Sequence, residues 1–221
     1  MRRNTRCFNL GKVNIGSDHP ISVQSMTKTD TRDIEKTVEQ INELQMAGCD
    51  IIRCAVPNID AAKSLKGIIL KTKLPIVADI HFEYRLALEA IKSGVHGLRI
   101  NPGNIGQKKR IISVVQSAKD SNIPIRIGVN SGSLEKDLLE KYGYPSADAL
   151  VESAERHLSI LDELDFKNVK VSVKSSNVNI MIDAYRKLAK KTDVPFHLGV
   201  TESGTYAVSY THLTLPTKRI V

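Results

Sequence analysis

The sequence is poor in aromatic residues and has no tryptophan. Phenylalanine and tyrosine together make up only 5% of the 221 residues. Single-stranded nucleic acids bind largely by stacking their bases on aromatic rings, so this scarcity argues against a nucleic-acid-binding module. The lysines and arginines give a net charge of +8 but are spread along the chain without forming a basic cluster. We interpret most of this charge as solvated helix surface and expect no nucleic acid partner.

The chain also lacks long apolar runs. No stretch approaches the roughly 18 apolar residues typical of a membrane-spanning helix. The basic opening MRRNTRCFNLG is not followed by the apolar stretch of a secretory signal. We therefore expect a cytoplasmic protein without a membrane partner.

Cysteine is scarce, and its spacing carries no metal motif. Cys7, Cys49 and Cys54 are odd in number and contain no C-x-x-C pair, which argues against a disulfide framework and a zinc site. We predict reduced thiols, with the second and third partly buried, and no metal ligands in this chain. The sequence also has no P-loop and no G-x-G-x-x-G fingerprint.

What the sequence has is a repeated strand and helix unit. Short β-branched runs alternate with longer amphipathic segments, and seven runs predict strands: 22–26, 51–56, 75–80, 97–101, 124–130, 168–173 and 196–201. Between the first two, apolar residues recur at helical spacing over 31–48, where Thr31 is suited to cap the start and Gly48 the end. Further helices are predicted within 82–94, 108–122, 147–164 and 178–192.

Such alternation predicts parallel strands, in an open doubly wound sheet or in a TIM-type (β/α)₈ barrel. Polar residues recur on one face of several strands, as Arg99 and Asn101 do, and this favours the interior of a barrel, because strands of an open sheet covered by helices are usually apolar on both faces. Seven recognisable strands leave the barrel incomplete. Residues 7–16 predict a β-hairpin that closes its bottom, and 131–146 predict a loop-and-helix excursion near its mouth.

Charged residues gather where the predicted strands end. Active sites of such barrels lie at the carboxyl ends of the strands. Four cations and two acids fall at or near these ends: Arg53, Arg99, Arg126, Lys174, Asp79 and Glu202. Cations with too few internal partners indicate an anion from outside, and arginine suits phosphate oxygens. On this hypothesis Arg99 binds a phosphate of the ligand, and backbone N–H groups of NPGNIG donate to the same anion. The alternative is that Arg99 forms a structural salt bridge with Asp79 or Glu202. His81 and His197 are weaker candidates, since a lone histidine at a strand end is more often structural.

Six motifs in this order span residues 22 to 204: VQSMT, VADIHF, LRINPGNIG, PIRIGVNSGSLEKDLLEKYG, KVSVKSS and HLGVTESG. Together they closely resemble the amino-terminal barrel of bacterial 4-hydroxy-3-methylbut-2-enyl diphosphate synthases, which is similar in fold to the dihydropteroate synthases. The resemblance implies an oxidoreductase that opens 2-C-methyl-D-erythritol 2,4-cyclodiphosphate in non-mevalonate isoprenoid synthesis. Its two linked phosphates would explain the excess of cations.

The resemblance also implies partners and residue roles. A separate carboxyl-terminal domain of the family carries a [4Fe–4S] cluster, which a homodimer brings to the partner's barrel, and flavodoxin or ferredoxin supplies electrons. The implied diphosphate ligands are Arg53, Arg99, Arg126 and Lys174, joined by Asn101. Asn130 and Asp79 would orient polar groups, and Glu202 would sit near the reacting carbon, so that Asp79 and Glu202 are the implied catalytic acids.

The resemblance ends near residue 205. We predict a partial substrate-binding barrel over 1–205 and a non-native tail over 206–221, with the iron–sulfur domain absent and the chain inactive alone. Two other interpretations stay open at this point. One is a different phosphate-binding barrel, such as a pterin-binding synthase or an aldolase-like lyase, and the other is a basic binding module without catalysis.

Overall fold

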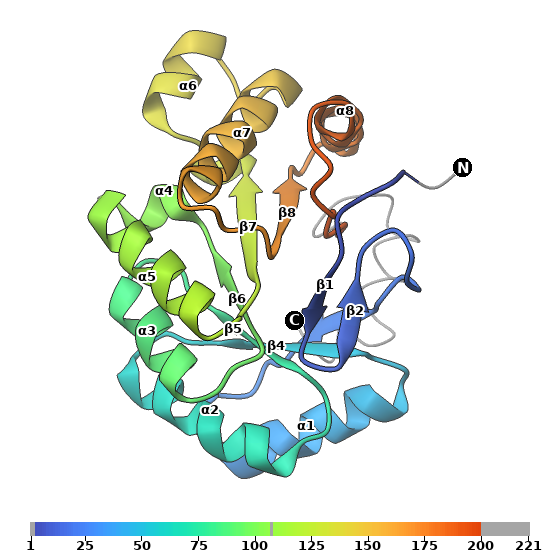
Figure 1. Cartoon of the computed structure of the whole chain (residues 1–221), viewed down its shortest axis with the longest axis vertical. Coiled ribbons are helices and arrows are strands. Elements are labelled where there is room, and N and C mark those ends of the chain that lie inside the picture. The colour runs from blue at the N-terminus through green and yellow to red at the C-terminus, as the bar shows by residue number, and fades with distance from the viewer. Residues whose placement is uncertain (1–2, 107, 200–221) are drawn as a thin grey trace.

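Six parallel strands form one curled sheet in sequence order (Figure 1). The computed structural model describes residues 3–106 and 108–199. The strands are β3 (Gln24–Met26), β4 (Ile51–Ala55), β5 (Ile76–Asp79), β6 (Gly97–Ile100), β7 (Ile125–Asn130) and β8 (Val169–Lys174). Six of the seven predicted strands are confirmed. The predicted strand at 196–201 contributes one parallel bridge, between Phe196 and Val171, and residues 200 and 201 lie outside the described residues.

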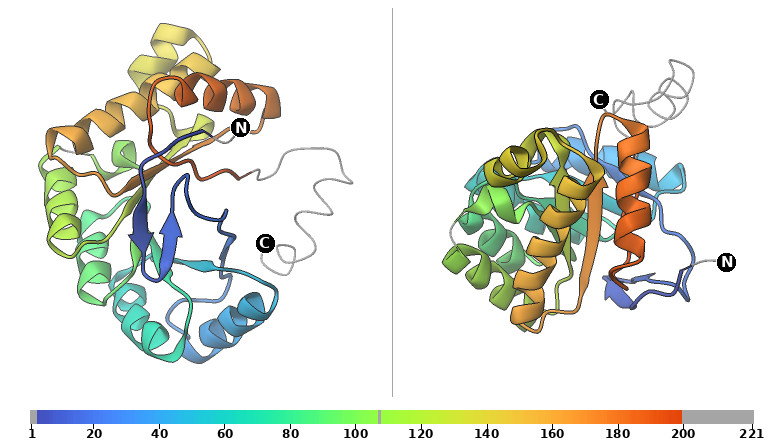
Figure 2. Two further views of the ribbon diagram at one scale, coloured as in Figure 1. Left: turned by 45° about the vertical axis from the view of Figure 1, so that its right-hand side comes forward. Right: turned by 90° about the horizontal axis from the view of Figure 1, so that it is seen from above.

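Helices cover the outside of the curled sheet (Figures 1 and 2). They are α1 (Ile34–Met46), α2 (Ile59–Lys71), α3 (Tyr84–Lys92), α4 (Pro102–Ile105), α5 (Lys108–Asp120), α6 (Lys136–Tyr142), α7 (Ala147–Glu163) and α8 (Val178–Ala189). The apolar core lies between these helices and the outward face of the strands, which leaves the inward face for polar side chains. Among the described residues, no helix has the length and apolar character that crossing a membrane requires.

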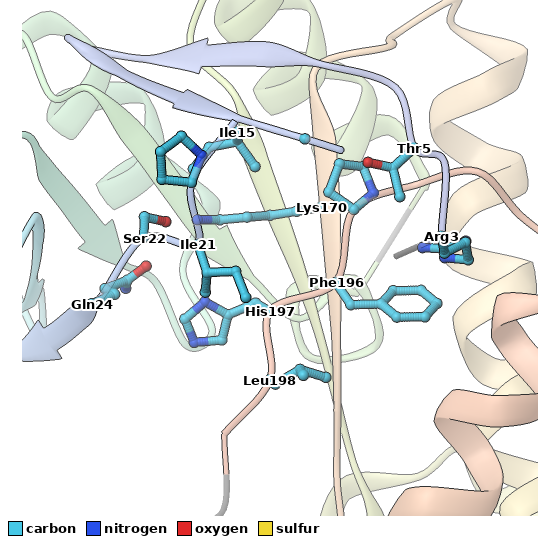
Figure 3. A pocket seen from close by; sticks show the side chains of 13 residues that line it. Arg3, Thr5, Ile15, Ile21, Ser22, Gln24, Lys170, Phe196, His197 and Leu198 are labelled. Atoms are coloured by element: carbon cyan, nitrogen blue, oxygen red, sulfur yellow. The ribbon is translucent and has the colours of Figure 1, made fainter. Parts of the chain in front are cut away.

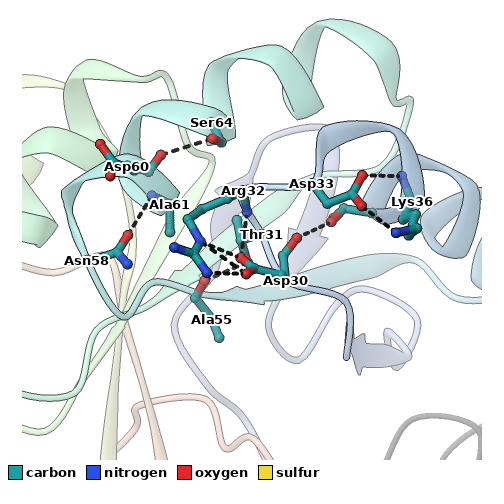
Figure 4. A network of polar contacts seen from close by, with 11 residues as sticks. Asp30, Thr31, Arg32, Asp33, Lys36, Ala55, Asn58, Asp60, Ala61 and Ser64 are labelled. Carbon is teal, nitrogen blue, oxygen red and sulfur yellow. Dashed lines mark hydrogen bonds and ion pairs between the residues drawn. The ribbon is translucent and has the colours of Figure 1, made fainter.

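The start of α1 corrects one sequence prediction. Asp33, not Thr31, caps the helix, and its side chain accepts a hydrogen bond from the backbone N–H of Lys36 at 3.2 Å (Figure 4). The Thr31 hydroxyl instead donates to the carbonyl oxygen of Ala55 at 2.7 Å, which ties the loop to the end of β4. Gly48 ends the helix as predicted, with a left-handed φ of 87°.

Helix α2 was not predicted from the sequence. Its buried face contains two alanines beside Leu65 and Ile68, so the apolar stripe is weak in the sequence. Asn58 caps it by accepting from the backbone N–H of Ala61 at 2.9 Å (Figure 4).

The predicted amino-terminal hairpin is confirmed. Strands β1 (Phe8–Leu10) and β2 (Val13–Ile15) pair antiparallel around a turn at residues 11–12. Phe8, Leu10 and Ile15 pack against Ile51 and Val77, which lie toward the amino ends of β4 and β5. The hairpin therefore covers the bottom of the curled sheet. The opposite end, where the strands finish, is called the mouth below.

Candidate anion-binding site

A row of charged residues crosses the inward face of the sheet. Asp79 is paired in register with Arg99, Arg99 with Arg126, and Arg126 with Lys170. Paired residues on neighbouring parallel strands point to the same side. Lys174 follows on the same side of β8, four residues beyond Lys170. The sheet thus brings the predicted cations together, as the sequence indicated.

Asp79 holds two of the arginines. Its side chain is only 4% exposed; Oδ1 accepts from Nη1 of Arg99 at 3.1 Å, and Oδ2 lies 3.3 Å from Nε of Arg53. Nε2 of His81, which is half exposed, lies 3.7 Å from Oδ2. The salt bridge considered for Arg99 is therefore present. It leaves the Nε of Arg99 buried without a hydrogen-bond partner in the described part of the chain, so the guanidinium keeps a donor for a ligand.

Arg126 is the most deeply buried cation of the row. It is 2% exposed, and within residues 3–106 and 108–199 its buried Nε and Nη1 have no hydrogen-bond partner. Burial, reinforced by the charges of Arg53 and Arg99, lowers its pKa to about 9. A buried guanidinium with two unused donors is a strong receptor for an oxyanion.

The two lysines of β8 are destabilised as ammonium ions. Burial, reinforced by Arg126 and Arg53, lowers the pKa of Lys170 to about 7. Burial, again with the nearby arginines, lowers the pKa of Lys174 to about 8. The pKa of His197 is pushed far below its ordinary value by burial and by Arg126 and Lys170, so its ring is neutral. Asp79 is the only buried carboxylate among the described residues, and its charge acts on Arg53, Arg99, Arg126 and Lys174.

Because buried cations outnumber buried carboxylates, we expect the free energy of unfolding to rise with pH. The folded chain releases the Lys170 proton near pH 7, whereas the unfolded chain holds it up to its ordinary pKa of 10.5. The unfolded state therefore binds more protons between these values, so the free energy of unfolding should increase with pH, by a few kcal/mol from pH 6 to 9. Urea denaturation at both pH values measures this. Lys170→Met should be more stable than wild type at pH 6 and show a flatter slope; equal slopes would contradict the assignment.

Gly128 makes room for Arg99. A Cβ at this position would lie 2.9 Å from Nε and 3.0 Å from Nη2 of Arg99. Gly128→Ala should therefore displace the guanidinium and weaken binding of a diphosphate ligand about tenfold, the effect of losing one charge-assisted hydrogen bond. Calorimetric titration measures the loss. Gly132→Ala, where the new Cβ meets only Asn130 Oδ1 at 3.8 Å, is the matched control and should bind normally.

The two predicted asparagines sit at turns beside the mouth. Asn101 is buried; its Oδ1 accepts from the N–H of Gly103 and its Nδ2 donates to the hydroxyl of Ser133, both at 3.2 Å. NPGNIG thus starts the one-turn helix α4 and is not an open loop. Asn130 is exposed and accepts from the N–H of Gly132 at 3.1 Å. Both amides hold backbone turns, and their contact with a ligand stays a prediction.

Two site features escaped the sequence analysis, and one predicted residue is not placed. The thioether of Met26 accepts from Nη2 and Nε of Arg53 at 3.0 and 3.3 Å, a contact for which an uncharged residue gives no sequence signal. Lys170 was not predicted to be a site residue. Glu202 lies outside the described residues, as does the tail 206–221.

The cysteines do not fit an iron–sulfur cluster. Such clusters need thiolates grouped around the metal. Cys54 is fully buried and burial raises its pKa to about 11, while burial also raises the pKa of Cys49, whose thiol donates to the carbonyl of Ile51. Cys7 is exposed. In the described ranges, no three His, Cys, Asp or Glu side chains are grouped to hold a metal.

Comparison with protein families decides between the open interpretations. The model of the GcpE TIM-barrel domain matches residues 5–214. The chain belongs to this family. The match includes the first nine residues of the segment 206–221, whose origin stays a prediction.

Relatives of this GcpE domain are similar over nearly the whole chain. The 4-hydroxy-3-methylbut-2-en-1-yl diphosphate synthase (flavodoxin) of Clostridium acetobutylicum is 61% identical over 204 residues, which are 92% of this chain and 58% of the relative. The enzyme of the same name from Clostridium perfringens is 59% identical over the same shares. The chain thus spans somewhat more than half the length of these relatives.

The fold of the GcpE domain is also found in distant solved structures. A Xanthomonas albilineans dihydropteroate synthase superposes with a TM-score of 0.56 at 14% identity, covering 98% of this chain and 84% of that one. At this identity the likeness supports the fold alone. It confirms the prediction of a TIM-type barrel similar to the dihydropteroate synthases.

Proposed function

We propose that this chain is the substrate-binding barrel of the reductase that converts 2-C-methyl-D-erythritol 2,4-cyclodiphosphate to 4-hydroxy-3-methylbut-2-enyl diphosphate. The observation that supports it best is the charge balance of the inward face, where four cations, Arg53, Arg99, Arg126 and Lys174, lie around one buried carboxylate. Unpaired buried charges are costly, and a dianionic ligand at the mouth would offset them. The names of the relatives support the same substrate class.

Each cation has a distinct part in this proposal. Arg126, with two unused buried donors, binds one phosphate through a forked contact. Arg99 and Arg53 are held by Asp79 in fixed positions, so they contribute to binding with little loss of side-chain entropy. Lys174 adds a point charge at the end of β8. Asp79 acts mainly by holding the two arginines, and Glu202 is proposed to lie near the reacting carbon.

In this proposal, groups outside the described residues transfer the electrons. The described residues do not fit a cluster. In this proposal residues 1–205 form the barrel, and a separate domain carries the [4Fe–4S] cluster and a homodimer brings it to the mouth. Flavodoxin, which the names of the relatives include, is the proposed electron donor. The chain alone binds substrate without turning it over.

Calorimetric titration with the cyclodiphosphate tests the proposal. The 221-residue chain should bind it saturably, and Arg99→Ala and Lys174→Ala should each weaken binding by roughly 1.5 to 3 kcal/mol, the range for charge-assisted hydrogen bonds. Lys167→Ala removes an exposed surface cation and should bind like wild type.

Two results would overturn the proposal. One is unchanged affinity in both site variants. The other is equal affinity for a short single-stranded DNA with steep salt dependence, which would favour the basic binding module.

A further inference from the structure

A cavity with polar side chains in its walls lies away from the mouth. A cavity of about 410 Å³ opens along the seam, which we define as the gap between β3 and residues 195–198, next to the hairpin (Figure 3). Hairpin residues Ile15 and Gly16 form one side of it. The polar groups that matter for its chemistry are Ser22, Gln24, Lys170 and His197. None of its lining residues is acidic.

Lys170 gives this cavity a charge without a counterion. The residue is 4% exposed, and in the described part of the chain its ammonium group makes no hydrogen bond or ion pair. Figure 3 shows its Nζ extended across the cavity toward Ser22. Buried charged groups of native proteins are normally paired, so this ammonium group indicates a missing ligand.

Lys170 lies deeper in the barrel than Lys174, beside Arg126. Lys170 stands near the start of β8, and Lys174 ends the strand. Four strand residues separate their Cα atoms by about 13 Å. Asp79 does not compensate Lys170, since this carboxylate is bound to Arg53 and Arg99. No carboxylate of the described residues therefore pairs with Lys170.

The walls offer donors suited to an oxyanion. Besides the Lys170 ammonium, the Ser22 hydroxyl and the Gln24 carboxamide face the cavity, and the His197 ring lies beside them (Figure 3). Because His197 is neutral, it offers a donor or an acceptor without adding repulsion between cations. Several donors around one ammonium suit a tetrahedral oxyanion better than a metal or an apolar molecule.

We propose that the seam cavity is a second anion site, built on Lys170, that binds a small tetrahedral oxyanion such as inorganic phosphate. The site goes beyond the proposed function and does not depend on it. Bound anion stabilises the ammonium form, so above pH 7 binding should be coupled to proton uptake by Lys170.

Site-resolved lysine labelling of the wild-type chain tests this without a variant. Cyanate carbamoylates unprotonated amines, so at pH 7.5 Lys170 should react faster than the surface lysines, as read from peptide masses. Inorganic phosphate should slow labelling of Lys170 saturably by at least fivefold, whereas sodium chloride at equal ionic strength should not. No protection by phosphate would overturn the proposal. So would a Lys170 that stays unlabelled without phosphate, because a site open to phosphate must admit the smaller cyanate.

Two variants separate this site from the mouth. In Lys174→Met, phosphate should still protect Lys170, even if binding of the cyclodiphosphate is lost. In Lys170→Met, calorimetry at pH 8 in two buffers of different ionisation enthalpy should show that the phosphate-linked proton uptake has disappeared. Protection of Lys170 that vanishes in Lys174→Met would mean one shared site and would overturn the proposal. Failure of cyclodiphosphate binding with Lys170 protection intact would count against the proposed function alone.

Discussion

Asp79→Asn should destabilise the fold more than any other single change in the row of charges. The amide keeps the size of the side chain but removes the charge that holds Arg53 and Arg99. Removing one partner of a buried ion pair typically costs about 3 to 5 kcal/mol, because the remaining charges stay buried and uncompensated. For a chain of this length the melting temperature should fall by roughly 10 °C.

Urea denaturation at pH 7 measures this effect. Glu39→Gln is the matched control, since it neutralises an exposed acid on α1. A loss for Asp79→Asn no larger than that of the control would show that the two arginines do not depend on this carboxylate.

Arg126→Met should have the opposite signature, with binding lost and the fold preserved. The guanidinium is buried without a hydrogen-bond acceptor for Nε and Nη1 in the described part of the chain. Replacing an uncompensated buried charge with an apolar side chain of similar length is neutral or stabilising. A diphosphate, by contrast, loses two charge-assisted hydrogen bonds, so its affinity should fall about a hundredfold or more.

Calorimetry and urea denaturation on the same sample separate the two effects of Arg126→Met. Arg156→Met is the control for loss of an arginine, because that side chain pairs with Asp137 and Glu152 on the outer surface. If Arg126→Met unfolds at lower urea and still binds normally, its role is structural and the mouth must bind anions by other residues.

The sequence predicted those features that depend on local pattern. β-branched runs located six strands, and alternation along β6 to β8 placed Arg99, Arg126 and Lys174 on one face. The cap of α1 was predicted wrongly, because Thr31 and Asp33 are both suitable residue types and only the tertiary contact of Thr31 with Ala55 separates them. The helix α2 was missed because its alanines bury well without raising the apolar signal.

The seam cavity could not be predicted from the sequence. The order of Lys170 and Lys174 along β8 places Lys174 at the mouth, but no pattern indicates that Lys170 lines a cavity. Two other features also depend on the register of neighbouring strands and could not be predicted. Met26 accepts a hydrogen bond from Arg53, and Gly128 leaves space for the guanidinium of Arg99.

The order of the strands has a consequence for how the chain is made. Each strand of the sheet pairs with the strand that precedes it in the sequence, so every new unit docks on one already synthesised. Such pairing lets each strand dock soon after it is synthesised, which favours vectorial folding during translation. The exception is the amino terminus, where Arg6 forms an ion pair with Asp193, 187 residues away. That contact can form only after α8 has left the ribosome, so we expect the amino-terminal arm to be the last part of the described structure to dock.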